Sequence, residues 1–239
     1  MKIAPKRRTE VRSTPRSLVD DLCETLAKRI RRDLGKGRSQ LPTERELAVE
    51  FEVSRTVVRE ATKRLELQGL LEVRHGIGLR LVDKLHAPLN GALELLLPDA
   101  VQRLRQLIET RRVIEPELAR LAAERAKPEH LRAMRRTQQQ LEKAVDTAEA
   151  IDADVEFHRL IAAAAGNEIL ELVLKSLGEL GRESRRATIA VTGSKLVHEH
   201  HGAILKQIEL RKPQGAFDAM ARHLAAADRD LNDHFVKQK

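Results

Sequence analysis

Apolar residues recur at helical spacing along almost the whole chain, and this periodicity constrains the fold more than any other feature. The main departure lies between residues 70 and 82, where two short extended pieces, LLEV and GLRLV, flank the turn RHGIG. Glycines there permit a tight turn, as in a two-stranded hairpin. We therefore expect a mainly α protein with one small β-hairpin.

Helix signals precede the hairpin. Apolar residues at steps of four from Leu18 to Ile30 form one stripe, which Gly35 ends. Thr43 and Glu46 then have the spacing of a capping box, in which each side chain bonds the backbone N–H group of the other residue. A second, short helix is expected to begin there.

A third helix is expected to begin after Ser54, a good N-cap residue, and to end at Gly69. Three helices followed by a hairpin describe a winged helix-turn-helix. The pattern after Pro98 is helical and predicts an antiparallel bundle. Its expected breaks are Pro128, Gly166–Asn167, Gly178–Gly181, Gly193 and Pro213.

The chain is thus expected to have four parts. They are a basic tail at residues 1–16, the winged helix-turn-helix at 17–82, a linker at 83–98 and the helical domain at 99–233. The basic charge is concentrated in the first two parts. Residues 1–82 hold 19 Lys and Arg against 12 Asp and Glu, whereas residues 83–239 hold 25 against 24. The N-terminal part of the chain is therefore suited to binding a polyanion.

Composition excludes several classes of protein. Four Phe and no Tyr or Trp argue against platforms that stack single-stranded bases. The single cysteine, Cys23, rules out internal disulfides and Cys-rich zinc modules. No apolar run approaches the ~18 residues of a membrane span. We expect a cytoplasmic protein that makes no membrane contact.

Polar and cationic residues gather where a recognition helix would enter the major groove. Serine and threonine hydroxyls and arginine guanidinium groups are suited to bases and phosphates. The candidate DNA-contacting residues are Ser54, Arg55, Thr56 and Arg59 on the third helix, Arg45 on the second, and His75 and Gly76 at the hairpin tip. The alternative is that these residues only cap and solubilise ordinary helices.

The segments LPTERELA and VSRTVVREATKRLELQGLLEVRHGIG closely resemble the DNA-binding domain of the GntR family of bacterial transcription regulators. The resemblance covers residues 17–82. It implies that Arg45, Arg55 and Arg59 are the main DNA contacts, with Ser54 and Thr56 beside them and the pair His75 and Gly76 in the minor groove. The end of the wing, GIGLRL, departs from the family pattern.

The helical part carries polar residues on apolar stripes. Asp154 and His158 lie one turn apart on such a stripe, and His201 and His223 lie on the inward stripes of two later helices. A buried carboxylate is costly unless it is paired or bound to a cation. The four residues could therefore hold one metal ion. The alternative is a core Asp–His hydrogen bond beside two unrelated histidines.

This part of the chain resembles the ligand-binding domain of the FadR-like branch of the GntR family, over residues 100–233. Segments that carry the resemblance include DVEFHRLIAAAAGN, HHGAIL and RHL. It implies Asp154, His158, His201 and His223 as metal ligands, with His200 as an alternative to His201. It also implies that Arg111 holds an effector carboxylate, with Arg112 as its rival. Zinc is the favoured metal, and nickel and manganese also accept this ligand set.

We expect a ligand-responsive transcription repressor that binds a palindromic operator as a homodimer. Its effector would be a small organic acid, such as a sugar acid or a hydroxy acid. The alternative is an architectural DNA-binding protein whose helical domain only dimerises. An enzyme is not expected, because Glu156, the nearest candidate base, lies on another helix face from Asp154.

Overall fold

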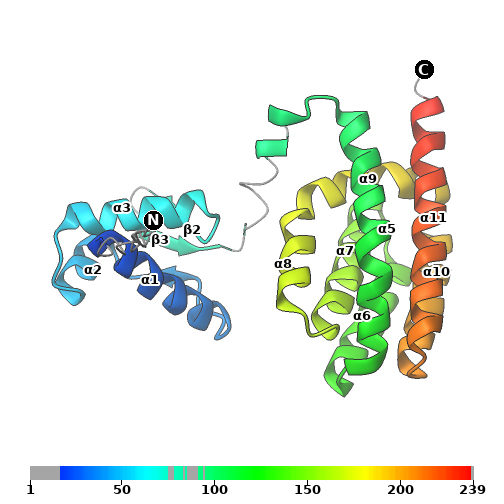
Figure 1. The fold of residues 1–239 in the computed structure, drawn as a ribbon, viewed down its shortest axis with the longest axis horizontal. Coiled ribbons are helices and arrows are strands. Elements are labelled where there is room, and N and C mark those ends of the chain that lie inside the picture. Colours follow the sequence, from blue (N-terminus) through cyan, green and yellow to red (C-terminus); the bar gives the residue numbers. More distant parts are fainter. Residues whose placement is uncertain (1–16, 75–77, 83, 85–90, 94, 238–239) are drawn as a thin grey trace, which may run out of the picture. The chain divides into compact units, whose positions relative to one another are not determined.

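The computed structural model describes residues 17–74, 78–82, 84, 91–93 and 95–237. The predicted tail at 1–16 and the residues His75 and Gly76 lie outside these ranges. Contacts divide the chain into two compact units, residues 1–84 and residues 85–239. Figure 1 shows a helical N-terminal unit with a small sheet and a C-terminal unit built of helices, as the sequence predicted.

The N-terminal unit is a winged helix-turn-helix. Its elements are α1 (Leu18–Leu34), β1 (Gln40–Leu41), α2 (Glu44–Glu50), α3 (Arg55–Leu67), β2 (Leu71–Arg74) and β3 (Gly78–Leu81). Strands β2 and β3 form the predicted hairpin, with Leu71 opposite Leu81. The two-residue strand β1 pairs antiparallel with the other edge of β3 and was not predicted.

Side chains fix where these helices begin. The predicted capping box is present at α2, where the Thr43 hydroxyl accepts from the N–H group of Glu46 and the Glu46 carboxylate accepts from that of Thr43. Ser54 caps α3 by accepting from the N–H group of Val57 at 3.3 Å. These contacts satisfy backbone donors that have no partner within the helix.

One predicted core residue of α1 is wrong. Leu22, Leu26 and Ile30 are buried, but Leu18 is 65% exposed and Val19 is buried in its place. Steps of four residues rotate by 400° on a helix of 3.6 residues per turn, so the stripe drifts by about 40° at each step. Over three steps, this drift turns Leu18 away from the core.

The C-terminal unit is a bundle of α-helices. They are α5 (Ala100–Arg125), α6 (Pro128–Lys143), α7 (Thr147–Ala164), α8 (Glu168–Ser176), α9 (Gly178–Thr192), α10 (Ser194–Glu209) and α11 (Pro213–Lys237). Two details differ from the prediction. Gly181 lies within α9 instead of ending a helix, and an unpredicted break at residues 144–146 separates α6 from α7.

The helices that position the functional site pack around one core. Helix α5 packs along α11 and against α7, and α10 packs against α11 and α6. Phe157, Leu118, Ile161, Ile208 and Leu224 are among its buried residues. Helix α8 differs, because none of its nine residues is buried. Within the described ranges, no helix is long and apolar enough to cross a membrane.

Candidate functional site

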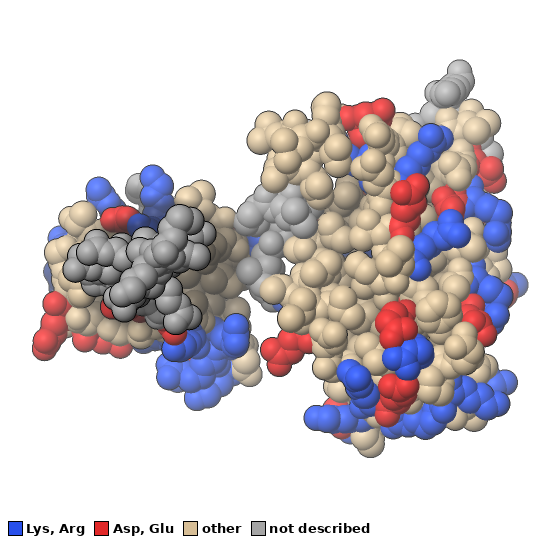
Figure 2. Space-filling view, in the orientation of Figure 1, with Lys and Arg blue, Asp and Glu red and all other residues tan. Residues whose placement is uncertain are grey.

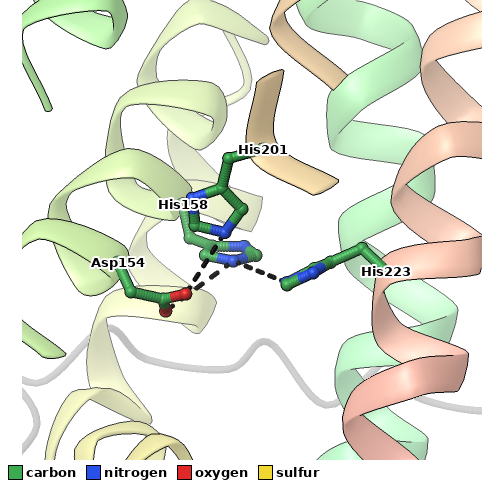
Figure 3. Close-up of side chains that lie close together, drawn as sticks. All are labelled: Asp154, His158, His201 and His223. Carbon is green, nitrogen blue, oxygen red and sulfur yellow. Dashed lines mark hydrogen bonds and ion pairs between the residues drawn. The ribbon is translucent and has the colours of Figure 1, made fainter. Parts of the chain in front are cut away.

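A cluster of one aspartate and three histidines lies inside the C-terminal unit. Helix α7 supplies Asp154 and His158, α10 supplies His201 and α11 supplies His223. All four residues are buried, and one nitrogen or oxygen atom from each lies within 4.8 Å of the others. Figure 3 shows the four side chains directed toward one another.

The two ring nitrogens of His201 lack hydrogen-bond partners in this cluster. The Nε2 atoms of His158 and His223 lie 3.2 Å apart. Nε2 of His201 lies 3.2 Å from Oδ1 of Asp154, but neither nitrogen of His201 has a hydrogen bond of acceptable geometry. Buried polar atoms normally have partners, so those of His201 indicate that something else satisfies this site.

A divalent metal ion fits the donor set. Ligand atoms that bind one ion at about 2.1 Å lie roughly 3 to 4 Å from each other, close to the spacing found here. Imidazole nitrogens and a carboxylate oxygen suit zinc, nickel or manganese. Asp154, His158, His201 and His223 would hold the ion.

Neighbouring residues fix the orientation of two of the histidines. Phe157 stacks on the ring of His201, with centroids 4.2 Å apart and planes 12° apart. Nδ1 of His158 lies 2.5 Å from Oε2 of Glu115. A proton held on Nδ1 by this carboxylate leaves Nε2 free as a metal ligand, the usual arrangement of metal-binding histidines.

Two buried arginines balance the two buried carboxylates. Nε of Arg111 donates to Oε1 of Glu115 at 2.6 Å. Arg185, on α9, donates through Nε to Asp154 and through Nη1 to the carbonyl oxygen of Gly181. The four charges sum to zero, so a bound divalent ion would leave a positive site that favours an anion.

The pKa values of these groups suit metal binding at neutral pH. Burial lowers the pKa of His158 to about 4, despite the nearby carboxylates. Burial, together with His201 and His158, holds the pKa of His223 well below its usual value. Burial alone would raise the pKa of Asp154, but Arg185 and His158 hold it well below its usual range. Neutral imidazoles and an ionised carboxylate are the forms that bind metal.

A cavity of about 200 Å³ adjoins the cluster. The buried residues Arg111, Glu115, His158 and Arg185 form one charged part of its lining. A second, smaller cavity, of about 20 Å³, is lined by Asp154 and His223 and by the same two arginines. Both arginines therefore line both cavities that adjoin the candidate metal site.

The structure distinguishes the alternative residues that the sequence analysis gave for the effector-binding arginine and for one of the metal-binding histidines. Arg111 is buried in the charged part of the cavity, whereas Arg112 is exposed and pairs with Asp228 at 2.8 Å. His201 belongs to the cluster, and His200 lies outside it, half-buried beside His223. Glu156 is half-buried and pairs with Arg159, and it does not belong to the cluster.

Sequence reasoning missed Glu115 and Arg185. Glu115 could have been found, because it lies four residues after Arg111, the spacing at which side chains on one helix face meet. Arg185 carries no such signal. It is 31 residues from Asp154 and reaches it only through the packing of α9 against α7.

In the N-terminal unit, the predicted DNA-contacting side chains lie on the surface. Ser54, Arg55, Thr56 and Arg59 are exposed along the first turns of α3, and Arg45 is exposed on α2. Within the described ranges, Arg55 and Arg59 form no ion pair. By contrast, Arg64 near the other end of α3 pairs with both Asp20 and Glu60.

Charge on the C-terminal unit is mixed. On the face shown in Figure 2, lysines and arginines are interspersed with aspartates and glutamates. This pattern agrees with the near balance of charge in residues 83–239. Such a surface provides no extended field of one sign for a polyanion.

Both units match known protein families. Residues 19–81 match the family of bacterial regulatory proteins called gntR, and residues 106–226 match the FCD domain. A solved structure described as Streptococcus agalactiae GntR has a TM-score of 0.67 and 27% identity. The match covers 89% of this chain and 100% of the chain in that structure.

Two curated relatives match this chain over most of their own length. The HTH-type transcriptional repressor NanR of Cronobacter sakazakii is 30% identical over 228 residues, 91% of this chain and 85% of the relative. The HTH-type transcriptional regulator LutR of Bacillus subtilis is 29% identical over 221 residues, 84% of this chain and 94% of the relative. These relatives are transcription regulators rather than enzymes. The chain therefore belongs to the GntR family of bacterial transcription regulators, with an FCD domain as its C-terminal effector domain.

Proposed function

We propose that this regulator is a repressor that binds a palindromic operator as a homodimer and responds to a small organic acid. The acid would bind beside a divalent metal ion held by Asp154, His158, His201 and His223. The observation that carries the proposal is the buried convergence of these four ligands next to Arg111 and Arg185.

Exposed cations support the DNA-binding part of the proposal. Arg55 and Arg59 on the first turns of α3 are not engaged by carboxylates of the described residues, so phosphates and guanine edges can be their partners. A homodimer presents two such helices to a two-fold symmetric site. His75 and Gly76 would add a minor-groove contact at the wing.

Charge supports an acidic effector. The bound metal would supply positive charge for a carboxylate, and Arg111 would grip that carboxylate at two points. Glu115 accepts a hydrogen bond only from the Nε atom of Arg111. The terminal nitrogens of Arg111 therefore still carry N–H groups that can donate to a ligand. The effector can change DNA binding only if its affinity differs between the DNA-bound and released arrangements.

The buried polar residues favour this function over an architectural one. A bundle that served only for dimerisation would place apolar residues such as Leu or Ile at these positions, because a buried Asp and three buried histidines cost free energy without a ligand. Binding of a metal ion and an effector at these residues would offset this free-energy cost.

Selection of genomic fragments by the purified protein tests the proposal. We expect one or a few palindromic sites, preferred over other DNA by a factor of about 10³ or more. Enzymes encoded beside those sites would narrow the identity of the acid. Binding without sequence preference would contradict the proposal and favour the architectural alternative.

A further inference from the structure

The cavity of about 200 Å³ beside the metal ligands has two chemically different ends. Its charged end consists of Arg111, Arg185, Glu115 and His158, all deeply buried. The rest of its lining is formed by apolar residues from α5, α7, α8 and the turn before α9, together with five further charged residues. The apolar residues are Leu107, Val155, Ala162, Leu174 and Leu177, and the charged ones are Arg159, Glu171, Lys175, Glu179 and Arg182.

The lining contains no uncharged hydrogen-bonding side chain other than that of His158. Among the described residues that border this cavity there is no Ser, Thr, Asn, Gln or Tyr. A buried hydroxyl group of a ligand needs a hydrogen-bond partner, and among the side chains of this lining only the charged ones and the ring of His158 can provide it. The apolar walls supply none.

Of the five further charged residues in the lining, Arg159, Lys175, Glu179 and Arg182 have partners elsewhere, and Glu171 is the exception among the described residues. Arg159 pairs with Glu156 at 2.6 Å, and Arg182 pairs with Asp152 at 2.5 Å. Lys175 also has a partner of its own. A ligand that used these groups would first have to break their existing contacts.

We propose that the effector is a carboxylic acid with a hydrocarbon body, alkyl or aromatic, and not a polyhydroxylated acid. This inference rests on the proposed function, since it takes the effector site to lie beside the metal ligands. The carboxylate lies between the two arginines, and the hydrocarbon fills the space between Leu107, Leu174 and Leu177. The volume admits an acid of on the order of ten non-hydrogen atoms.

A series of acids that share one carboxylate tests this assignment. Zinc-loaded protein is titrated calorimetrically with butanoate, pentanoate and hexanoate, and with lactate and gluconate as hydroxylated counterparts. Each added CH₂ group is expected to raise the affinity about fourfold, because it leaves water for an apolar wall. Hexanoate is then expected to bind at least tenfold more tightly than gluconate.

Two substitutions on the same helix sharpen the test. Leu174→Asn places an amide in the apolar wall and is expected to weaken hexanoate binding about tenfold, while butanoate loses less. Leu172→Asn is the matched control, because Leu172 is on α8 but does not line the cavity and is 49% exposed. It should leave both affinities unchanged.

The results distinguish failure of the hydrocarbon assignment from failure of the proposed effector site. Tighter binding of gluconate or lactate than of hexanoate overturns the hydrocarbon assignment and leaves the proposed acid effector standing. Equal loss of hexanoate affinity in both variants also overturns the assignment. Absence of binding by every acid in the series, with zinc bound, overturns the assignment and contradicts the proposed effector site as well.

Discussion

At the scale of single residues, Glu115 connects the two functions proposed for the buried site. One carboxylate oxygen lies against the ring of His158 and the other accepts from Arg111. Burial would raise the pKa of Glu115, but Arg111 and His158 hold it well below its usual value. The residue stays ionised at neutral pH and can orient both a proposed metal ligand, His158, and the arginine proposed to bind the effector, Arg111.

Substitution of Glu115 should therefore weaken metal binding without removing a ligand. Glu115→Gln is expected to lower zinc affinity roughly 10- to 100-fold, the usual effect of losing a partner of a ligating histidine. Competition with a chromogenic chelator measures this change. Glu117→Gln, at an exposed residue that pairs with Arg120, is the control. Unchanged zinc affinity in a folded Glu115→Gln protein would contradict the orienting role.

The capping box of α2 gives a second prediction for a single residue. The N–H group and the hydroxyl of Thr43 bond the ionised Glu46 carboxylate and lower its pKa below the usual 4.5. This interaction therefore stabilises the fold above the unfolded pKa and is lost as the pH falls through the lower, folded value. Titration of the carboxyl carbon by NMR should show a lowered pKa that Thr43→Ala moves back toward 4.5.

At the scale of elements, the arginines of α3 differ in their ion pairing according to their position along the helix. Arg55 in its first turn forms no ion pair in the described part of the chain, whereas Arg64 near its end is held by Asp20 and Glu60. Capping by Ser54 fixes where the helix begins and so which residues lie at its first turn.

This division predicts unequal effects on DNA binding. Arg55→Ala is expected to weaken operator binding about 10- to 100-fold, equivalent to roughly 1 to 3 kcal/mol. Arg64→Ala removes the same charge from the same helix and is expected to change affinity much less. Fluorescence anisotropy at fixed salt makes the comparison. Similar losses in the two variants would indicate that only total charge matters.

Elements with strong local signals were predictable. The capping residues Thr43 and Ser54 and the glycines that follow α1 and α3 mark helix ends with specific backbone chemistry. Strand β1 was missed, because two residues show no periodicity and pair only through β3. The break at residues 144–146 was missed because neither Gly nor Pro occurs there.

The buried Asp/His cluster was predictable for the same reason, and the residues that support it were not. Asp154, His158, His201 and His223 each interrupt an apolar stripe, and this conflict is visible within one helix at a time. The contact between Arg185 and Asp154 depends on the packing of two helices. Local periodicity contains no information about such packing.

At the scale of the whole molecule, the two units have separate hydrophobic cores. The core of the N-terminal unit draws only on residues from Val19 to Leu81. The other cores begin at Leu104 and include no residue of the N-terminal unit. A change in the metal site should therefore leave the DNA-binding fold intact.

Loss of one metal ligand should separate the two activities. His223→Ala is expected to reduce zinc content and abolish the response to the acid, while operator affinity without acid stays within about threefold, since His223 shares no core with the DNA-binding unit. Elemental analysis and anisotropy measure the two quantities. Full zinc retention would contradict the four-ligand arrangement.

The ligands of the proposed metal come from three helices and span residues 154 to 223. A bound ion would join these helices as a removable crosslink and add its binding free energy to that of folding, about 2.7 kcal/mol when the free ion is at 100 times its Kd. Proteases act on transiently opened chains, and a difference of this size changes protein abundance several-fold. The cellular amount of the repressor would then follow the metal supply, and metal starvation would relieve repression even without the acid.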